Sequence, residues 1–176
     1  MNLLRVLVLF FLFSCEDNFQ EIQNINNKNI LPLGVTQNLK LIYTDSAKVK
    51  AILYSSLNKD YTNKPFPYSE FPNGIKISFF DDENNETIVT SQYAIMYNKT
   101  NIVDMKGNVI INNYDGSELK TSQLFWDPDQ EWLFTEKKFT FKNIDYDIAA
   151  TRLDANRSFT IFNTGKLDGK VLVEDN

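Results

Sequence analysis

The chain has 176 residues, which suits one domain, and 43% of them are hydrophobic, which is enough to build a core. Its formal net charge is −5 at pH 7 and no basic run occurs anywhere. Because neutralising phosphates takes clustered Lys and Arg, this charge balance excludes nucleic acid as a partner. Histidine is absent, so the commonest general base and the commonest transition-metal ligand are missing. Composition therefore disfavours histidine-dependent catalysis and metal binding, and we predict a binding protein that is not an enzyme and needs no cofactor or metal.

The first 15 residues have the plan of a secretory signal peptide. Arg5 precedes an apolar run over residues 6–13, which ends at Ser14 and Cys15. The run is too short to cross a hydrocarbon core of about 30 Å as a helix, which takes about 20 residues. Residues 12–15, Leu-Phe-Ser-Cys, resemble a bacterial lipobox, whose cysteine is acylated. We predict that Cys15, the only cysteine, is a lipid anchor. Two alternatives remain for this segment: a cleaved signal peptide that leaves Cys15 as a free thiol, and a short anchor that is not cleaved.

Residues 16–38 are predicted to form a flexible tether. They are rich in Asn, Gln and Glu and show no sustained apolar period, and Pro32 and Gly34 interrupt them. The folded domain is expected to start near Leu39 and to occupy residues 39–176.

Beyond Leu39 the sequence predicts β-strands almost throughout, and no segment shows a helical stripe. Apolar, alternating or aromatic stretches occupy residues 39–43, 48–54, 74–80, 108–111 and 138–142. Turn-forming clusters stand at residues 81–85, 114–117, 127–129 and 168–169. Pro65 and Pro67 indicate an extended, irregular segment between residues 60 and 71.

An internal repeat runs through the strands. Residues 90–92, Thr-Ser-Gln, recur at 121–123, and a weaker copy begins at Thr151. A second motif opens strands at Gly74, Gly107, Lys138 and Gly169, with copies about 30 residues apart. Since a single hairpin cannot bury its apolar face alone, the units are expected to stack into one continuous sheet pair.

Five segments carry a family resemblance in one order along the chain. They are residues 43–51 (YTDSAKVKA), 68–75 (YSEFPNGI), 91–94 (SQYA), 106–109 (KGNV) and 119–127 (LKTSQLFWD). This series resembles the LptC family, the membrane-attached periplasmic component of the lipopolysaccharide export bridge of Gram-negative bacteria. The resemblance spans residues 40–155. It departs at the anchor, because many family members keep one transmembrane helix whereas this chain looks lipidated.

The resemblance implies an all-β fold, a twisted open β-jellyroll in which antiparallel hairpins stack into a V. Lipopolysaccharide acyl chains would pass through an apolar groove, from the inner-membrane ABC transporter to the next bridge protein, an LptA-like partner. It also implies attachment to the inner membrane, facing the periplasm. Sorting to the outer membrane stays an alternative. A structural or adhesive envelope lipoprotein with a packed β-sandwich is the alternative function.

Strand alternation selects the side chains that would line such a groove. The candidates are Ile75, Ile77, Phe79, Tyr93, Ile95, Val109, Ile111, Leu124, Trp126, Phe139 and Phe141. Burying an acyl methylene against them is worth about 0.8 kcal/mol, so binding needs no chemistry. The alternative is that these residues fill a dry core.

Two further features carry predictions. Gly107 matches a family glycine at a strand start, where it would form a bulge or adopt a positive φ. The last strand, with Lys170, Val171, Leu172 and Val173, would lie at an edge with unpaired backbone groups. We predict that it pairs with the first strand of the next bridge protein.

Two acid pairs are interpreted as structural. Asp127 and Asp129 flank a proline, which is typical of a turn. Asp145 and Asp147 lack the further oxygen ligands of a calcium site. A hydrolase is disfavoured as well, because no serine has a histidine to activate it.

Overall fold

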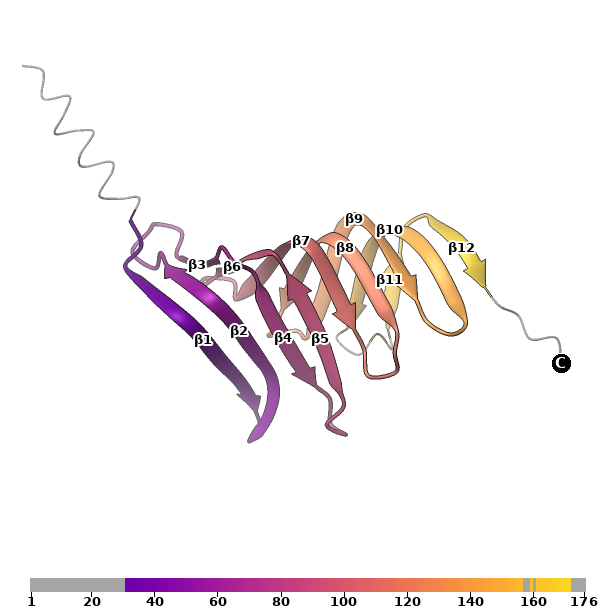
Figure 1. The fold of residues 1–176 in the computed structure, drawn as a ribbon, viewed down its shortest axis with the longest axis horizontal. Helices are drawn as coiled ribbons and strands as arrows, with labels where there is room; N and C mark the ends of the chain where they lie inside the picture. Colours follow the sequence, from indigo (N-terminus) through magenta and orange to yellow (C-terminus); the bar gives the residue numbers. More distant parts are fainter. Residues whose placement is uncertain (1–30, 157–158, 160, 172–176) are drawn as a thin grey trace, which may run out of the picture. The chain divides into compact units, whose positions relative to one another are not determined.

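The computed structural model describes residues 31–156, 159 and 161–171. All regular structure in this part is β, in twelve strands of one antiparallel sheet (Figure 1). No helix among the described residues is long and apolar enough to cross a membrane. The signal peptide, Cys15, most of the predicted tether, Leu172 and Val173 lie outside the described residues.

The strands are β1 Gly34–Asp45, β2 Lys48–Asp60, β3 Tyr68–Phe71, β4 Ile75–Phe80, β5 Glu86–Ser91, β6 Tyr93–Tyr97, β7 Ile102–Asn112, β8 Glu118–Asp127, β9 Trp132–Lys142, β10 Tyr146–Asn156, β11 Phe162–Thr164 and β12 Leu167–Val171.

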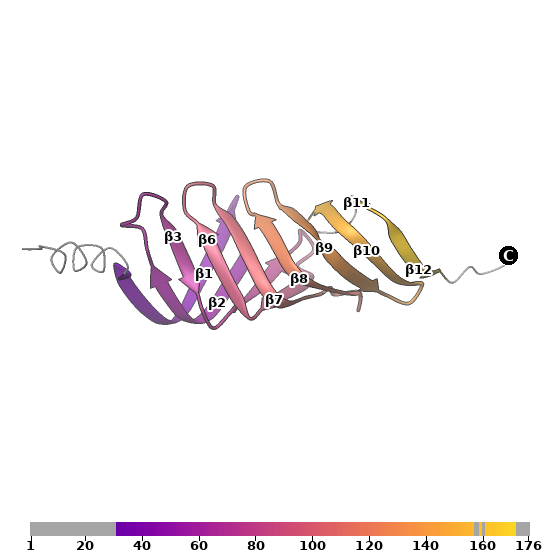
Figure 2. The same cartoon turned by 90° about the horizontal axis from the view of Figure 1, so that it is seen from above.

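The sheet folds into two layers because its long strands change neighbours halfway along. β2 pairs first with β4 and then with β3, β7 pairs with β6 and then with β5, and β10 pairs with β12 and then with β11. The short strands β3 and β4 thus act as two halves of one bent strand, as do β5 with β6 and β11 with β12. The molecule is a simple meander of bent strands (Figure 2). The predicted jellyroll of stacked antiparallel hairpins is confirmed.

The bends line up as a corner row, which we define as the residues where strands pass from one layer to the other. Ladder pairing is interrupted there, between Lys106 and Val109 in β7, between Thr121 and Phe125 in β8, and at Arg152 in β10. All three copies of the Thr-Ser-Gln repeat fall on this row. The repeat therefore marks the bend, and its period is two bent strands long.

Backbone groups that lose ladder partners at the corner row are bonded by side-chain hydroxyls. The Thr121 hydroxyl lies 3.0 Å from the Lys138 carbonyl oxygen, to which it donates. The Ser55 hydroxyl makes the equivalent bond of 2.8 Å to the Gly74 carbonyl oxygen. Burying a carbonyl oxygen without a hydrogen bond costs free energy. Because the two hydroxyls supply the missing bonds, the sheet can bend without this cost.

Glycines supply the conformations that the bend requires. Gly74 has φ of +80° and Gly107 has φ of +73°, in the left-handed region. A Cβ on Gly74 would overlap the Ser91 carbonyl oxygen, and one on Gly107 would come within 2.9 Å of the Gln92 side chain. In the last unit the corner glycine is Gly165, whose Cβ would meet the Thr151 carbonyl oxygen.

Two boundary predictions are wrong. Residues 34–38, assigned to the tether, belong to β1, because β2 runs on to Asp60 and its last residues need a backbone partner. Residues 168–169, assigned to a turn, lie in β12 opposite Ala149 and Ile148. Backbone pairing in both cases outweighs the local turn and loop propensity.

The core lies between the layers. Its largest fully buried side chains include Phe71, Ile77, Met105, Ile111 and Leu124. The rings of Phe79 and Trp126 meet edge to face with centroids 4.7 Å apart. Core residues come from strands β2 to β10, so one apolar interior runs the length of the stack.

Gly74→Ala is predicted to destabilise the protein by about 3 kcal/mol, because it adds an overlap with the neighbouring strand to the strain of a positive φ. Gly116→Ala is the matched control. Gly116 has φ of +82° but nothing within 4 Å of an added Cβ, so its cost should be about 1 kcal/mol. Urea unfolding measures both, and equal losses would contradict the role given to the corner row.

Candidate functional site

The predicted groove residues mostly gather in the interior. Eight of them are at most 6% exposed: Ile75, Ile77, Phe79, Val109, Ile111, Leu124, Trp126 and Phe139. Phe141 is partly buried and packs against the same cluster. The interior is therefore an apolar surface that is folded onto itself, with the two layers in contact.

Tyr93 and Ile95 are exceptions, and their predicted inward direction is wrong. In β6 Ala94 is fully buried and Met96 packs on the core, so the alternating positions 93 and 95 face outward. The corner at Gln92 shifts the alternation of β6 by one residue relative to β5. Tyr93 instead donates a hydrogen bond of 3.0 Å to the Glu70 carboxylate.

The C-terminal part of the interior holds a cavity of about 40 Å³. It is lined by Leu119, Phe139, Phe141, Ile148, Leu153 and Phe159. All six side chains are apolar, and the volume is far below that of an acyl chain. The sequence analysis did not name Ile148, Leu153 or Phe159 as interior residues. The alternation of inward and outward side chains in β10 could have identified Ile148 and Leu153, whereas Phe159 lies in a connection that has no such alternation.

Phe159 closes this cavity from the connection between β10 and β11. Its φ of +56° is rare for a bulky side chain. Its backbone N–H donates to the Asn156 carbonyl oxygen over 3.0 Å, and its ring packs on the core. The contact of the ring with the core favours this conformation despite its backbone strain.

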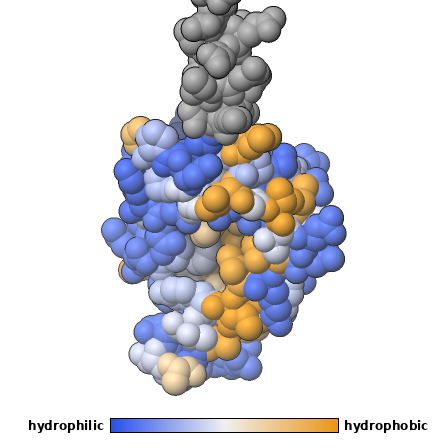
Figure 3. Space-filling model, turned by 90° about the vertical axis from the view of Figure 1, so that its left-hand side faces the viewer, coloured by the Kyte–Doolittle hydropathy of each residue, from blue (hydrophilic) through white to orange (hydrophobic). Residues whose placement is uncertain are grey.

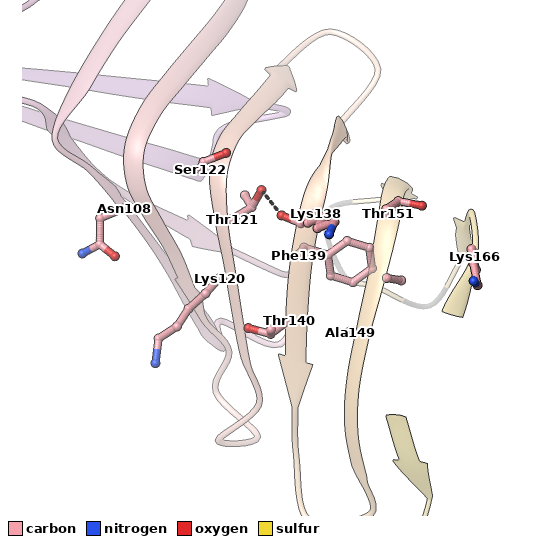
Figure 4. Close-up of a pocket in the computed structure, with 11 residues that line it drawn as sticks. Asn108, Lys120, Thr121, Ser122, Lys138, Phe139, Thr140, Ala149, Thr151 and Lys166 are labelled. Atoms are coloured by element: carbon pink, nitrogen blue, oxygen red, sulfur yellow. Dashed lines mark hydrogen bonds between the residues drawn. The ribbon is translucent and has the colours of Figure 1, made fainter. Parts of the chain in front are cut away.

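A larger cavity of about 690 Å³ lies beside the corner row, between strands β8, β9 and β10 (Figure 4). Exposed side chains of Asn108, Lys120, Lys138 and Thr140 line it, together with the bond from Thr121 to Lys138. Lys120 also forms an ion pair of 2.6 Å with Glu118. The cavity arises where the β8–β9 ladder is interrupted, and its lining combines these polar side chains with the buried apolar side chains of Phe139 and Ala150.

Both ends of the stack present a strand edge. β1 pairs only with β2, and β12 pairs only with β10, among the described strands. β1 is exposed along nearly its whole length, and Leu41, Ile42 and Tyr43 are between 39% and 54% exposed. Apolar side chains form a band down this end face (Figure 3). Of the predicted partner strand, Lys170 and Val171 lie in β12.

The acid pairs have the roles of turn and surface residues. The Asp127 carboxylate accepts the backbone N–H groups of Asp129 and Gln130, over 3.0 and 3.1 Å. Asp147 lies 4.0 Å from the Lys142 ammonium, and both side chains are largely exposed. Within the described part of the chain, no three His, Cys, Asp or Glu side chains gather closely enough to hold a metal ion.

A polar cluster lies on the outer face of the layer that contains β3, β6 and the first half of β7. Burial, together with the hydrogen bond to Glu70, raises the pKa of Tyr93 from 10.0 to about 12. Burial also raises the pKa of Tyr61 and of Tyr68. The hydrogen bond from Lys106 to the buried Asp104 raises the pKa of that lysine. The bonds from Tyr93 to Glu70 and from Lys106 to Asp104 tie neighbouring side chains of this layer together.

These features define a class: a β-jellyroll binding protein with an apolar interior and strand edges at both ends. The chain belongs to the LptC family, since the family model described as "Lipopolysaccharide-assembly, LptC-related" matches residues 3–163. No curated protein matches the chain. The family places it among the bridge components of lipopolysaccharide transport, facing the periplasm, and this family is not one of enzymes.

Stability is predicted to fall between pH 10 and about 12 in a way that depends on Tyr93. The folded state holds the Tyr93 proton more tightly than the unfolded state, so the contribution is complete below pH 10 and is lost as pH rises to the folded pKa. In Tyr93→Phe the free energy of unfolding should fall less steeply over this window, with Tyr61 and Tyr68 supplying the remainder. Tyr114→Phe, on an exposed turn, is the control and should keep the wild-type slope.

Proposed function

We propose that this protein accepts lipopolysaccharide from the inner-membrane ABC transporter and passes it to the next bridge protein, with the acyl chains between its two layers. The observation that carries the proposal is the continuous apolar interior, which extends from β2 to β10 and is built of buried side chains such as Ile77, Met105 and Leu153. Sugars and phosphates would stay in water at the free rim of the layers.

The layers must part to admit an acyl chain, since the interior cavity of about 40 Å³ is too small for one. Among the described strands, only the bent strands themselves join one layer to the other by strand pairing. The rim can therefore open without loss of ladder hydrogen bonds. Each acyl methylene that enters replaces side-chain contacts of the same apolar kind and gains about 0.8 kcal/mol over its state in water.

The packed interior also fits a second function, that of a structural or adhesive envelope lipoprotein. In that case the two layers stay closed and side chains such as Ile77 and Leu133, which are fully buried, never meet a ligand. The two functions differ in whether a lipid reaches the interior, and a cross-linking probe placed there separates them.

A photoreactive side chain at Phe79, Trp126 or Phe139 is predicted to form lipopolysaccharide adducts in membranes that contain the working transporter. A probe at Lys142 is the matched control, because this residue lies in β9 like Phe139 but its side chain is 70% exposed and lines neither of the cavities described above. The absence of adducts at all three interior positions, with the transporter active, would contradict transport and favour the structural function.

We further propose that the last strand pairs with an LptA-like bridge protein. β12 is bonded to β10 along one edge, and its other edge has no partner among the described strands. Unpaired N–H and C=O groups at such an edge bind an incoming strand by backbone hydrogen bonds, which need no particular side-chain sequence.

Deletion of residues 169–176 is predicted to abolish cross-linking to the next bridge protein, because it removes most of the edge strand and the residues after it. Cross-links to the transporter and the thermal unfolding midpoint serve as controls and should change little. Retention of the bridge cross-link in the shortened protein would show that the partner binds elsewhere.

At the other end of the chain we propose that Cys15 is acylated and holds the protein at the inner membrane, facing the periplasm. The residues between Cys15 and β1 then serve as the tether. This placement is supported by the family, whose members act beside the inner-membrane exporter, and by the lipobox-like sequence around Cys15.

A further inference from the structure

The connection between β2 and β3, residues 61–67, presents an aromatic side chain to solvent between two lysines. Phe66 is 79% exposed. The Lys99 ammonium lies 5.4 Å from the centroid of the Phe66 ring, and the Lys64 ammonium lies 5.9 Å from that of Tyr61. Exposing a whole phenylalanine ring is costly in water, so a conformation that maintains it needs an explanation.

The connection is built to hold the ring outward. The rings of Tyr61 and Tyr68 stack at its base with centroids 4.7 Å apart, and the Tyr61 N–H donates to the Tyr68 carbonyl oxygen over 2.9 Å. The Asn98 N–H and the Lys99 ammonium donate to the carbonyl oxygens of Pro67 and Pro65, over 3.1 and 3.2 Å. Prolines on both sides of Phe66 fix its neighbours' φ angles, which limits how far the ring can fold back.

Further apolar surface adjoins the base of this connection. Leu33 and Val35 are 66% and 58% exposed. The Leu33 N–H donates to the Asp60 carbonyl oxygen over 2.7 Å, and Val35 pairs with Lys59 in β2. Exposed apolar side chains and the basic connection therefore lie together at this end of β2.

Basic and acidic side chains lie at different connections along the row of loops that includes residues 61–67. The β2–β3, β6–β7 and β8–β9 connections follow one another there (Figure 2). Lys64 and Lys99 belong to the first two, whereas Asp129, which accepts a hydrogen bond from Asn101, belongs to the third. Asp60, at the base of the first, is engaged by the Thr62 N–H. Lys99 thus lies over the Phe66 ring and Lys64 lies in the same connection as Phe66, whereas the acidic Asp129 lies two connections further along.

We propose that this tip docks on the surface of an anionic bilayer, with Phe66 inserted at the level of the headgroups and Lys64 and Lys99 against lipid phosphates. Aromatic rings flanked by lysines are the side chains that favour this interface. The inference rests on the proposed lipid anchor. Cys15 precedes Pro32 by about 17 residues, which reach about 60 Å at most, so an acylated Cys15 keeps the domain near the membrane.

Docking would be tested with full-length protein tethered to vesicles of phosphatidylethanolamine and phosphatidylglycerol that contain brominated lipid. Phe66→Trp reports on the tip. Ile144→Trp is the matched control, since Ile144 is an 86% exposed apolar residue in the β9–β10 connection (Figure 1). The tryptophan at position 66 should be quenched and blue-shifted relative to the wild-type background of two tryptophans, while that at position 144 should stay unquenched. Lys64→Gln combined with Lys99→Gln should remove most of the quenching at position 66.

Flotation of the same samples separates this proposal from the proposed anchor. If the wild-type chain floats with vesicles and Cys15→Ser does not, the anchor is present and the quenching is read directly. If the wild-type chain does not float, its free Cys15 thiol is coupled to a maleimide lipid and the quenching is read on that material. Equal quenching at positions 66 and 144 would overturn docking on the bilayer. A blue shift at position 66 that appears only when transporter is added would overturn it as well, because the tip would then bind the transporter.

Discussion

The structure depends on how its strands bend. A strand that passes from one layer to the other loses ladder hydrogen bonds at the bend, and the exposed backbone groups must find other partners. Hydroxyls at Ser55 and Thr121 and positive-φ glycines at Gly74 and Gly107 meet this requirement in successive strands. Because the bends are aligned, the layers are hydrogen-bonded to each other along one side only. The opposite side is held by apolar contact, and an apolar ligand can replace that contact.

A meander of this kind leaves an edge strand at each end, which in an isolated protein invites aggregation. β1 and β12 are such edges in the described part of the chain, and β1 also carries exposed apolar side chains such as that of Ile42. In a bridge component these edges are useful, because a neighbouring sheet can continue the ladder and the apolar interior together. Edge pairing and cargo transfer are then one geometric requirement, since the interiors of two proteins align only if their strands do.

Much of this architecture could be predicted from the sequence, because alternation survives within each half-strand. The period of two predicts correctly that Ile75, Ile77 and Phe79 face inward. It fails for Tyr93 and Ile95, because the bend at Gln92 changes whether odd or even positions face inward, and no residue type in the sequence indicates that change. Residues 34–38 and 168–169 carry loop-like side chains on a backbone that pairs with distant strands. Phe159 closes the cavity from a connection without any period, so only three-dimensional packing identifies it.

The repeat of about 30 residues has a consequence for evolution and design. One repeat is two bent strands, and strands in a sheet lie about 4.8 Å apart, so each repeat lengthens the stack by about 10 Å. Insertion or loss of a whole repeat would keep the direction of every following strand. It would also keep the bends aligned and leave both edge strands unchanged. Insertion of a single strand would reverse the direction of the terminal edge. The length of the apolar interior is therefore expected to vary among relatives in steps of two strands, so that the number of repeats sets the distance that the domain spans.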